Sequence, residues 1–181
     1  MAEISAADVS ERKEVIDAVC AVTTDGQALK IAEWVKMTPG GHAAAHLDRY
    51  LSGKGGTEKV NLEAVLREDF GVRQKVTSSI MAALRAGKTS GSVPIPQEVY
   101  RNQDWQFAIG GMNIQWEAMA PQVTAGGAYQ PGLVRVWFKN LYQWHPNEPR
   151  VTQCLHQAAV RMQKAGAQNF LMTGEATVPI H

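Results

Sequence analysis

The densest group of chemically reactive side chains lies in the nine residues from Tyr142 to Arg150. His145 has the side chain best suited to accept a proton near neutral pH, and Glu148 is placed to orient it or to take a proton itself. Arg150 offers a planar cation for an anionic group. Two prolines stiffen the backbone of this segment. We therefore predict a site whose catalytic residues are Tyr142, His145 and Glu148, and whose substrate-binding residues are Trp144 and Arg150.

The same segment has an alternative interpretation as an ordered turn. In that case Arg150 pairs with Glu148, and the neighbouring aromatic side chains fill the core instead of binding a ligand. The position of the segment, where a predicted strand gives way to a predicted helix, is one where binding groups often lie. Both interpretations stay open from the sequence alone.

Two histidines and two cysteines are the other candidates for metal binding or nucleophilic chemistry. His42 and His46 stand four apart, on one face of a helix, but a zinc protease would have Glu where this chain has Ala43. No third ligand is evident, so we expect a solvated or partly buried pair and no metal or other cofactor. Cys20 lies in an apolar stretch without a nearby base, so we expect a buried structural cysteine. Cys154 and His156 are two apart on a helix and point in different directions, so a Cys–His pair would need His145 or His42 from elsewhere. A disulfide between the two cysteines stays open in an oxidising compartment.

The elements that would position these residues begin with helices. Apolar residues in the first half recur at helical spacing, Asn61 is a candidate cap, and Gly87 is a typical helix end. Helices are predicted from Val9 to Cys20, between Asp25 and Pro39, from Ala43 to Leu51, over Leu62–Asp69 and from Val72 to Gly87. Residues 88–98 contain two prolines and small polar residues, and this composition predicts a linker.

Beyond the linker the apolar pattern changes to a period of two, which is typical of strands. The phase reverses at Gly110-Gly111, as it would at a β-bulge or a tight bend. Strands are predicted at Trp105 to Ile109, Met112 to Trp116, Val134 to Trp144 and Phe170 to Val178, with a helix over Arg150–Ala165. The predicted fold is therefore α+β in a single domain, 1–181. A helical part (1–87) packs on a small antiparallel sheet with one further helix (99–181).

The charge balance excludes several classes of partner. Lys and Arg number 18 against 17 Asp and Glu, which leaves a net charge of +1 and no electrostatic case for nucleic acid or an anionic membrane. The first residues carry charges where a signal peptide would be apolar, and no run of about 18 apolar residues could cross a membrane. We expect a protein made in the cytoplasm, with no transmembrane segment and any export independent of a cleaved signal peptide.

Three segments carry a resemblance to a known class of proteins. Residues 104–111 (DWQFAIGG), 142–147 (YQWHPN) with Arg150 downstream, and 48–56 (DRYLSGKGG) resemble effector and polymorphic-toxin domains delivered by contact-dependent machines such as type VI secretion. The resemblance covers about half of the chain. Within that class, the lipid II-cleaving colicin M type carries Asp-x-Tyr-Asp followed by His-Arg. Tyr142 matches its tyrosine, whereas Asn140 and Gln143 replace the two aspartates and the His-Arg pair is absent.

The resemblance implies a function and a set of partners. The protein would be a secreted bacterial effector, a toxin or virulence factor passed into a rival or host cell. Any enzymatic activity would be hydrolysis of an envelope-linked substrate. Its partners would be a protein of the secretion apparatus and a cognate immunity protein or host target. The alternatives are a non-catalytic effector that binds a host or bacterial protein, since Trp and Tyr often dominate binding energy, and an accessory component of the secretion apparatus.

Overall fold

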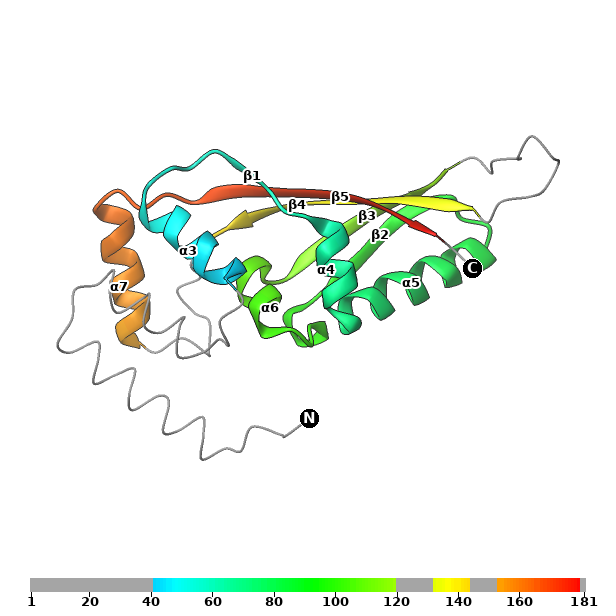
Figure 1. Ribbon diagram of the computed structural model, residues 1–181, viewed down its shortest axis with the longest axis horizontal. Helices are drawn as coiled ribbons and strands as arrows, with labels where there is room; N and C mark the ends of the chain where they lie inside the picture. The colour runs from blue at the N-terminus through cyan, green and yellow to red at the C-terminus, as the bar shows by residue number, and fades with distance from the viewer. Residues whose placement is uncertain (1–40, 120–131, 144–152, 180–181) are drawn as a thin grey trace, which may run out of the picture. The chain divides into compact units, whose positions relative to one another are not determined.

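The computed structural model describes residues 41–119, 132–143 and 153–179 (Figure 1). Contacts divide the chain into two compact units. In the described residues, one unit comprises 41–56, 142–143 and 153–170, and the other comprises 57–119, 132–141 and 171–179. The first two predicted helices, Val9 to Cys20 and the one after Asp25, lie outside the described residues.

A five-stranded sheet organises the second unit, with strand order β1-β5-β4-β3-β2. Strand β3 is antiparallel to both β2 and β4, whereas β1 runs parallel to β5. The sheet is therefore mixed, and the prediction of an antiparallel sheet was wrong in this respect, because the three-residue β1 gives no sequence signal. The strands are β1 (Thr57–Lys59), β2 (Ser90–Ile95), β3 (Met112–Ala118), β4 (Leu133–Tyr142) and β5 (Phe170–Pro179).

The helices of this unit lie on one side of the sheet (Figure 1). They are α4 (Leu62–Glu68), α5 (Phe70–Arg85), the 3₁₀ turn η1 (Gln97–Val99) and α6 (Gln103–Ile109). Alternate side chains of β3 and β4, such as Ile114 and Phe138, are buried on that side. Their neighbours, such as Gln115 and Lys139, are half-buried or exposed on the other side. The core is thus one-sided, as antiparallel strands permit.

Two helix starts in this unit are capped by side chains, of which the Asn61 cap was predicted and the Asp69 cap was not. The Asn61 side chain accepts a hydrogen bond from the backbone N–H of Ala64 at the start of α4. Asp69 does the same for Val72 at the start of α5. Side-chain acceptors at these positions satisfy N–H groups that the helix itself cannot pair. The predicted helices over Leu62–Asp69 and from Val72 onward are confirmed.

The first unit contains α3 (His42–Leu51) and α7 (Gln153–Lys164). The buried face of α3 carries Ala43, His46, Leu47 and Tyr50, which follow the three- and four-residue spacing of one helical face. The backbone N–H of Gln168, beyond α7, donates to the Tyr50 carbonyl oxygen at 3.1 Å. The predicted helix from Ala43 to Leu51 is confirmed.

The α+β class is confirmed, but helices and strands interleave and there is no purely helical N-terminal half. Residues 88–98, predicted as a linker, contain β2 and the first two residues of η1. Only Val93 and Ile95 of β2 are buried, because β2 is an edge strand that faces the core on one side. An edge strand tolerates proline and exposed serine, so its sequence is close to that of a loop.

The segment from Trp105 to Ile109, predicted as a strand, is helix α6. Trp105 and Ile109 are four apart and both buried, and the Trp105 indole N–H donates to the Glu68 carboxylate at 3.0 Å. The Asn102 side chain caps the helix. Gly110, with φ +71°, ends it, so the double glycine marks a helix end and not a bulge.

Candidate functional site

Tyr142 is the one predicted site residue within the described part of the chain. Trp144, His145, Glu148 and Arg150 lie outside it, as does Cys20. Their roles stay predictions. Residues 153–157 belong to α7, but the positions of the Cys154 and His156 side chains are likewise not described.

Tyr142 stands at the end of β4 and stacks on Phe170, the first residue of the neighbouring strand β5. The ring centroids are 4.7 Å apart and the planes are inclined by 15°. Neighbouring strands bring side chains on the same face within contact distance, which explains a close pair from residues far apart in the sequence. Tyr142 is half-buried and Phe170 is buried.

His46 packs against both of these rings. Its imidazole lies 5.8 Å from the Tyr142 ring and 5.6 Å from the Phe170 ring, with interplanar angles of 82° and 80°. Only 9% of His46 is exposed, whereas His42, one turn earlier, is exposed. The two histidines therefore have different environments. The sequence placed His42 and His46 together on one helix face as a solvated or partly buried pair, and it gave no sign that His46 meets Tyr142.

Two further polar side chains of α3 complete the group. The Arg49 guanidinium lies 5.2 Å from the Phe170 ring centroid, and its Nη2 donates to the Gly55 carbonyl oxygen at 2.8 Å. The Tyr50 ring is 6.1 Å from that of Tyr142. Burial raises the pKa of Tyr50 to about 12, although a hydrogen bond with Gln163 acts in the opposite direction. Tyr50 is therefore a neutral phenol at pH 7.

We call His46, Arg49, Tyr50, Tyr142 and Phe170 the Tyr142 cluster. It combines an imidazole able to transfer a proton, two phenols and a guanidinium suited to an anion. In the described ranges, no group of three or more His, Cys, Asp or Glu side chains is arranged to hold a metal ion. The chemistry available from these side chains is therefore acid–base transfer beside a cation.

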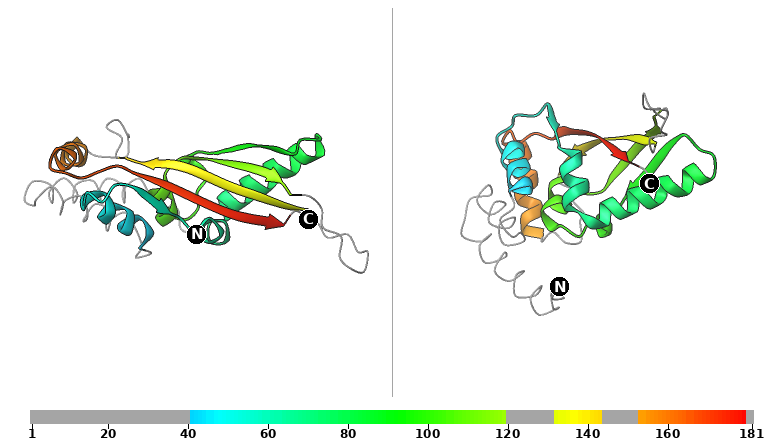
Figure 2. Two further views of the ribbon diagram at one scale, coloured as in Figure 1. Left: turned by 90° about the horizontal axis from the view of Figure 1, so that it is seen from above. Right: turned by 45° about the vertical axis from the view of Figure 1, so that its right-hand side comes forward.

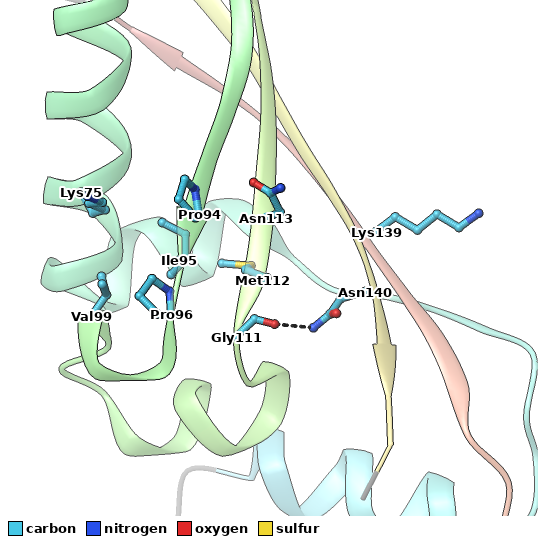
Figure 3. A pocket seen from close by; sticks show the side chains of 10 residues that line it. All are labelled: Lys75, Pro94, Ile95, Pro96, Val99, Gly111, Met112, Asn113, Lys139 and Asn140. Atoms are coloured by element: carbon cyan, nitrogen blue, oxygen red, sulfur yellow. Dashed lines mark hydrogen bonds between the residues drawn. The ribbon is translucent and has the colours of Figure 1, made fainter. Parts of the chain in front are cut away.

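The second unit contains a groove of about 550 Å³, open to solvent, at the end of β2 (Figure 3). Half of its lining residues are apolar, two are lysines and two are asparagines. The Asn140 amide donates to the carbonyl oxygens of Ile109 and Gly111, which fixes the start of β3. No motif signalled this groove in the sequence. It is lined by Lys75, Pro94, Ile95, Pro96, Val99, Gly111, Met112, Asn113, Lys139 and Asn140.

Comparisons with known proteins give no family for this chain: no family model, no curated protein and no solved structure matches it. Within the described residues, none of the helices has both the length and the apolar character needed to cross a membrane.

Proposed function

We propose that the protein is a secreted bacterial effector, a toxin delivered by a type VI-like system, that hydrolyses an envelope-linked substrate in a rival or host cell. The delivery part rests on the resemblance carried by residues 48–56, 104–111 and 142–147. The enzymatic part rests on one observation, the contact between Tyr142 and the buried imidazole of His46. A histidine held against a predicted site residue is the kind of group that general acid–base catalysis uses.

In this proposal His46 transfers a proton, and the Tyr142 hydroxyl donates a hydrogen bond to the substrate. Arg49 attracts an anionic group such as a phosphate of an envelope precursor. The support for these roles is that the His46 imidazole and the Arg49 guanidinium both lie against the stacked pair of Tyr142 and Phe170. His145 as a base and Arg150 as an anion-binding residue remain predictions for the segment that follows Tyr142.

The test is growth of a bacterial host that expresses the chain either in the cytoplasm or exported to the periplasm. We expect killing in one compartment only, and its loss in Tyr142→Phe, which removes one hydroxyl and leaves the ring stacking in place. Tyr100→Phe is the control, because it removes the same hydroxyl from a tyrosine that is buried in the other unit. His145→Ala tests the predicted base in the same assay.

Each outcome has a defined meaning. Killing by Tyr142→Phe at the level of the parent chain would contradict the proposed mechanism. Absence of killing in both compartments, with folded protein present, would contradict a bacterial toxin. Killing lost in His145→Ala but retained in Tyr142→Phe would transfer the activity to the 144–150 segment.

A non-catalytic effector that binds a protein is the second candidate. The observation that favours it is the side of the sheet opposite α4 to α6, where Arg135 lies 5.3 Å from the ring of the half-buried Trp137. Trp and Arg are the side chains most enriched at binding hot spots. Growth inhibition that survives Tyr142→Phe and is lost in Trp137→Ala would support this candidate over the enzyme.

A further inference from the structure

We propose that two copies of this chain associate through the open side of the five-stranded sheet, about a two-fold axis that runs along the strands between β4 and β5. We call this side the open face; it consists of the strand side chains that point away from α4 to α6. The inference concerns the second unit and does not rest on the Tyr142 cluster. Two patterns carry it: a row of alternating charges across the strands, and a strip of apolar side chains along β4 and β5.

The strand registers determine which side chains share the open face. In β4 the even-numbered residues 134–138 are buried toward the helices, so the odd-numbered residues, such as Trp137, lie on the open face. The pairings of β3 with β4 and of β1 with β5 continue this face across the sheet. The left view of Figure 2 shows β5, β4 and β3 side by side. In the described part of this unit no helix lies on the open face (Figure 1).

Four charged side chains cross the open face with alternating sign. Glu117 of β3 is paired with Arg135 of β4, and Arg135 donates to both carboxylate oxygens of Glu175 in β5, at 2.9 and 2.7 Å. Lys59 of β1 pairs with Thr173, the next residue of β5 on this face. The Arg135 hydrogen bonds, and to a smaller extent the charge of Lys59, lower the pKa of Glu175. The order across the strands is therefore minus, plus, minus, plus, and all four side chains are exposed.

An alternating row of four charges is complementary to its own reverse. A two-fold axis along the strands, between β4 and β5, turns the row end for end. Glu117 then meets Lys59 of the second copy, and Arg135 meets Glu175 of the second copy. A two-fold axis along the row itself would instead set each charge against its own copy, which is repulsive. The row therefore favours one orientation, in which every contact occurs twice, as in a closed two-fold interface.

The apolar side chains of the open face lie beside this axis. Leu133, Trp137 and Leu141 are on β4, and Leu171 is on β5. Leu141 is 45% exposed and the other three are half-buried. On this face the strands farther from the axis, β3 and β1, carry only polar or charged residues. An apolar centre inside a polar rim is the usual arrangement of a protein interface, and it supplies the burial that exposed ion pairs alone do not.

Lys139 is the one further charged side chain that the five strands place on the open face. It lies four residues along β4 from Arg135, beyond Trp137, and Figure 3 shows it extending away from the sheet. A lysine stem packs on apolar surface while its ammonium stays in solvent. Lys139 therefore fits beside the apolar strip without an opposite charge.

A second copy is a better occupant of this face than an unrelated protein. An unrelated protein would have to present the same four charges in reverse order around an apolar strip, whereas this chain already has them. The second candidate function gives Trp137 to a target protein, so the experiment must separate these two partners.

The test is the mass of the full chain in solution, measured by light scattering after size exclusion over a range of concentrations. We expect the mass to rise toward twice the monomer value by about 100 μM, as for an interface of modest affinity. Glu117→Lys should raise the dissociation constant by about tenfold or more, because it sets like charges opposite each other at both ends of the interface. Lys59→Glu should do the same, and Trp137→Ala should also weaken association. Glu63→Lys, the same charge change at an exposed position of α4, is the matched control and should behave as the parent chain.

Mixing the two charge variants tests the pairing itself. In a mixed pair each reversed charge meets an opposite charge on the other chain. A one-to-one mixture of Glu117→Lys and Lys59→Glu should therefore recover the dimer that each variant alone forms poorly. Circular dichroism and urea unfolding of each variant check that the fold is retained.

A chain that stays monomeric over this range would overturn the proposal, whether another part of the chain or another protein covers the face. Equal association of the parent and the two charge variants would also overturn it, as would a mixture that fails to recover the dimer. Growth inhibition by a monomeric chain that is lost in Trp137→Ala would assign the face to a target protein instead. None of these results bears on the toxicity of Tyr142→Phe, so this proposal and the proposed enzymatic function fail separately.

Discussion

Replacing Asp69 with alanine should destabilise the protein far more than removing an ordinary helix cap. Asp69 is fully buried. One carboxylate oxygen accepts the N–H of Val72 at 2.9 Å and so caps α5, while the other accepts the N–H groups of Arg101 and Asn102 at 2.9 and 2.8 Å. A single side chain therefore joins the start of α5 to the segment that leads into α6.

The magnitude follows from these three bonds. Loss of the cap costs about 1 kcal/mol, and each of the other two N–H groups that loses its acceptor adds about 1–2 kcal/mol. Asp69→Ala should therefore lower the free energy of unfolding by about 3–5 kcal/mol, a large part of the stability of an ordinary domain. Asp69→Asn keeps one acceptor oxygen and replaces the other by an amide donor, so at least one N–H loses its acceptor and an intermediate loss is expected.

Asn61→Ala is the matched control, because Asn61 caps α4 with a single bond to the Ala64 N–H and is itself exposed. Its expected cost is about 1 kcal/mol. Urea unfolding followed by circular dichroism and tryptophan fluorescence would measure both variants, and equal slopes against urea would show that the comparison is valid. Equal losses for Asp69→Ala and Asn61→Ala would refute the account of Asp69 as a three-bond anchor.

Three other substitutions have defined outcomes. Gly174→Ala would place a Cβ 2.5 Å from a carbon of the Phe138 ring, so it should lower stability by about 1–3 kcal/mol, whereas Gly132→Ala meets no atom within 4 Å and should leave the Tm unchanged. The pKa of Tyr50 is raised from 10.0 to about 12, so the unfolded chain loses this proton first and stability falls as the pH rises through that interval; Tyr50→Phe should make that fall shallower in alkaline unfolding curves. The buried Tyr100 hydroxyl has no hydrogen-bond partner among the described residues, so in urea titrations Tyr100→Phe should change stability by less than about 0.5 kcal/mol.

The long elements of this fold could be predicted because burial repeats along them with a clear period. Val72, Val76 and Ile80 of α5 are all buried. In β3 and β4, buried side chains alternate with more exposed ones, as the sequence pattern predicted. The strand from Phe170 onward is β5, and the helix predicted over Arg150–Ala165 corresponds to α7 where residues are described. In each case one face of the element meets the core, which is what periodicity reports.

The elements that were missed lack that regularity. β1 has three residues, and β2 buries only two, so neither is long enough for alternation to stand out. In α6 the alternation of Trp105, Phe107 and Ile109 predicted a strand, and this prediction was wrong. Trp105 and Ile109 are four apart and both buried, which is the spacing of one helical face. The Asn102 cap and Gly110 were the local signals of a helix.

The candidate site was predictable only at Tyr142. His46 contacts Tyr142 and Phe170, which lie about a hundred or more positions later in the sequence. Such a contact depends on tertiary packing. The groove at the end of β2 also depends on tertiary packing, because its lining comes from α5, η1 and three strands. Local spacing carries no information about which distant elements meet.

The interior place of β5 in the sheet, between β1 and β4, has a consequence for synthesis on the ribosome. β5 is made after the other four strands, yet it separates β1 from β4 and is the strand with which β1 pairs. Until residues 171–179 emerge, β4 therefore keeps an unpaired edge of the kind that drives aggregation. Closing more than a hundred residues between Thr57 and its partner Leu171 also makes sheet completion a slow, late event. The sheet thus stays incomplete until β5 has emerged, and a chaperone that covers the β4 edge during this interval should raise the yield of folded protein.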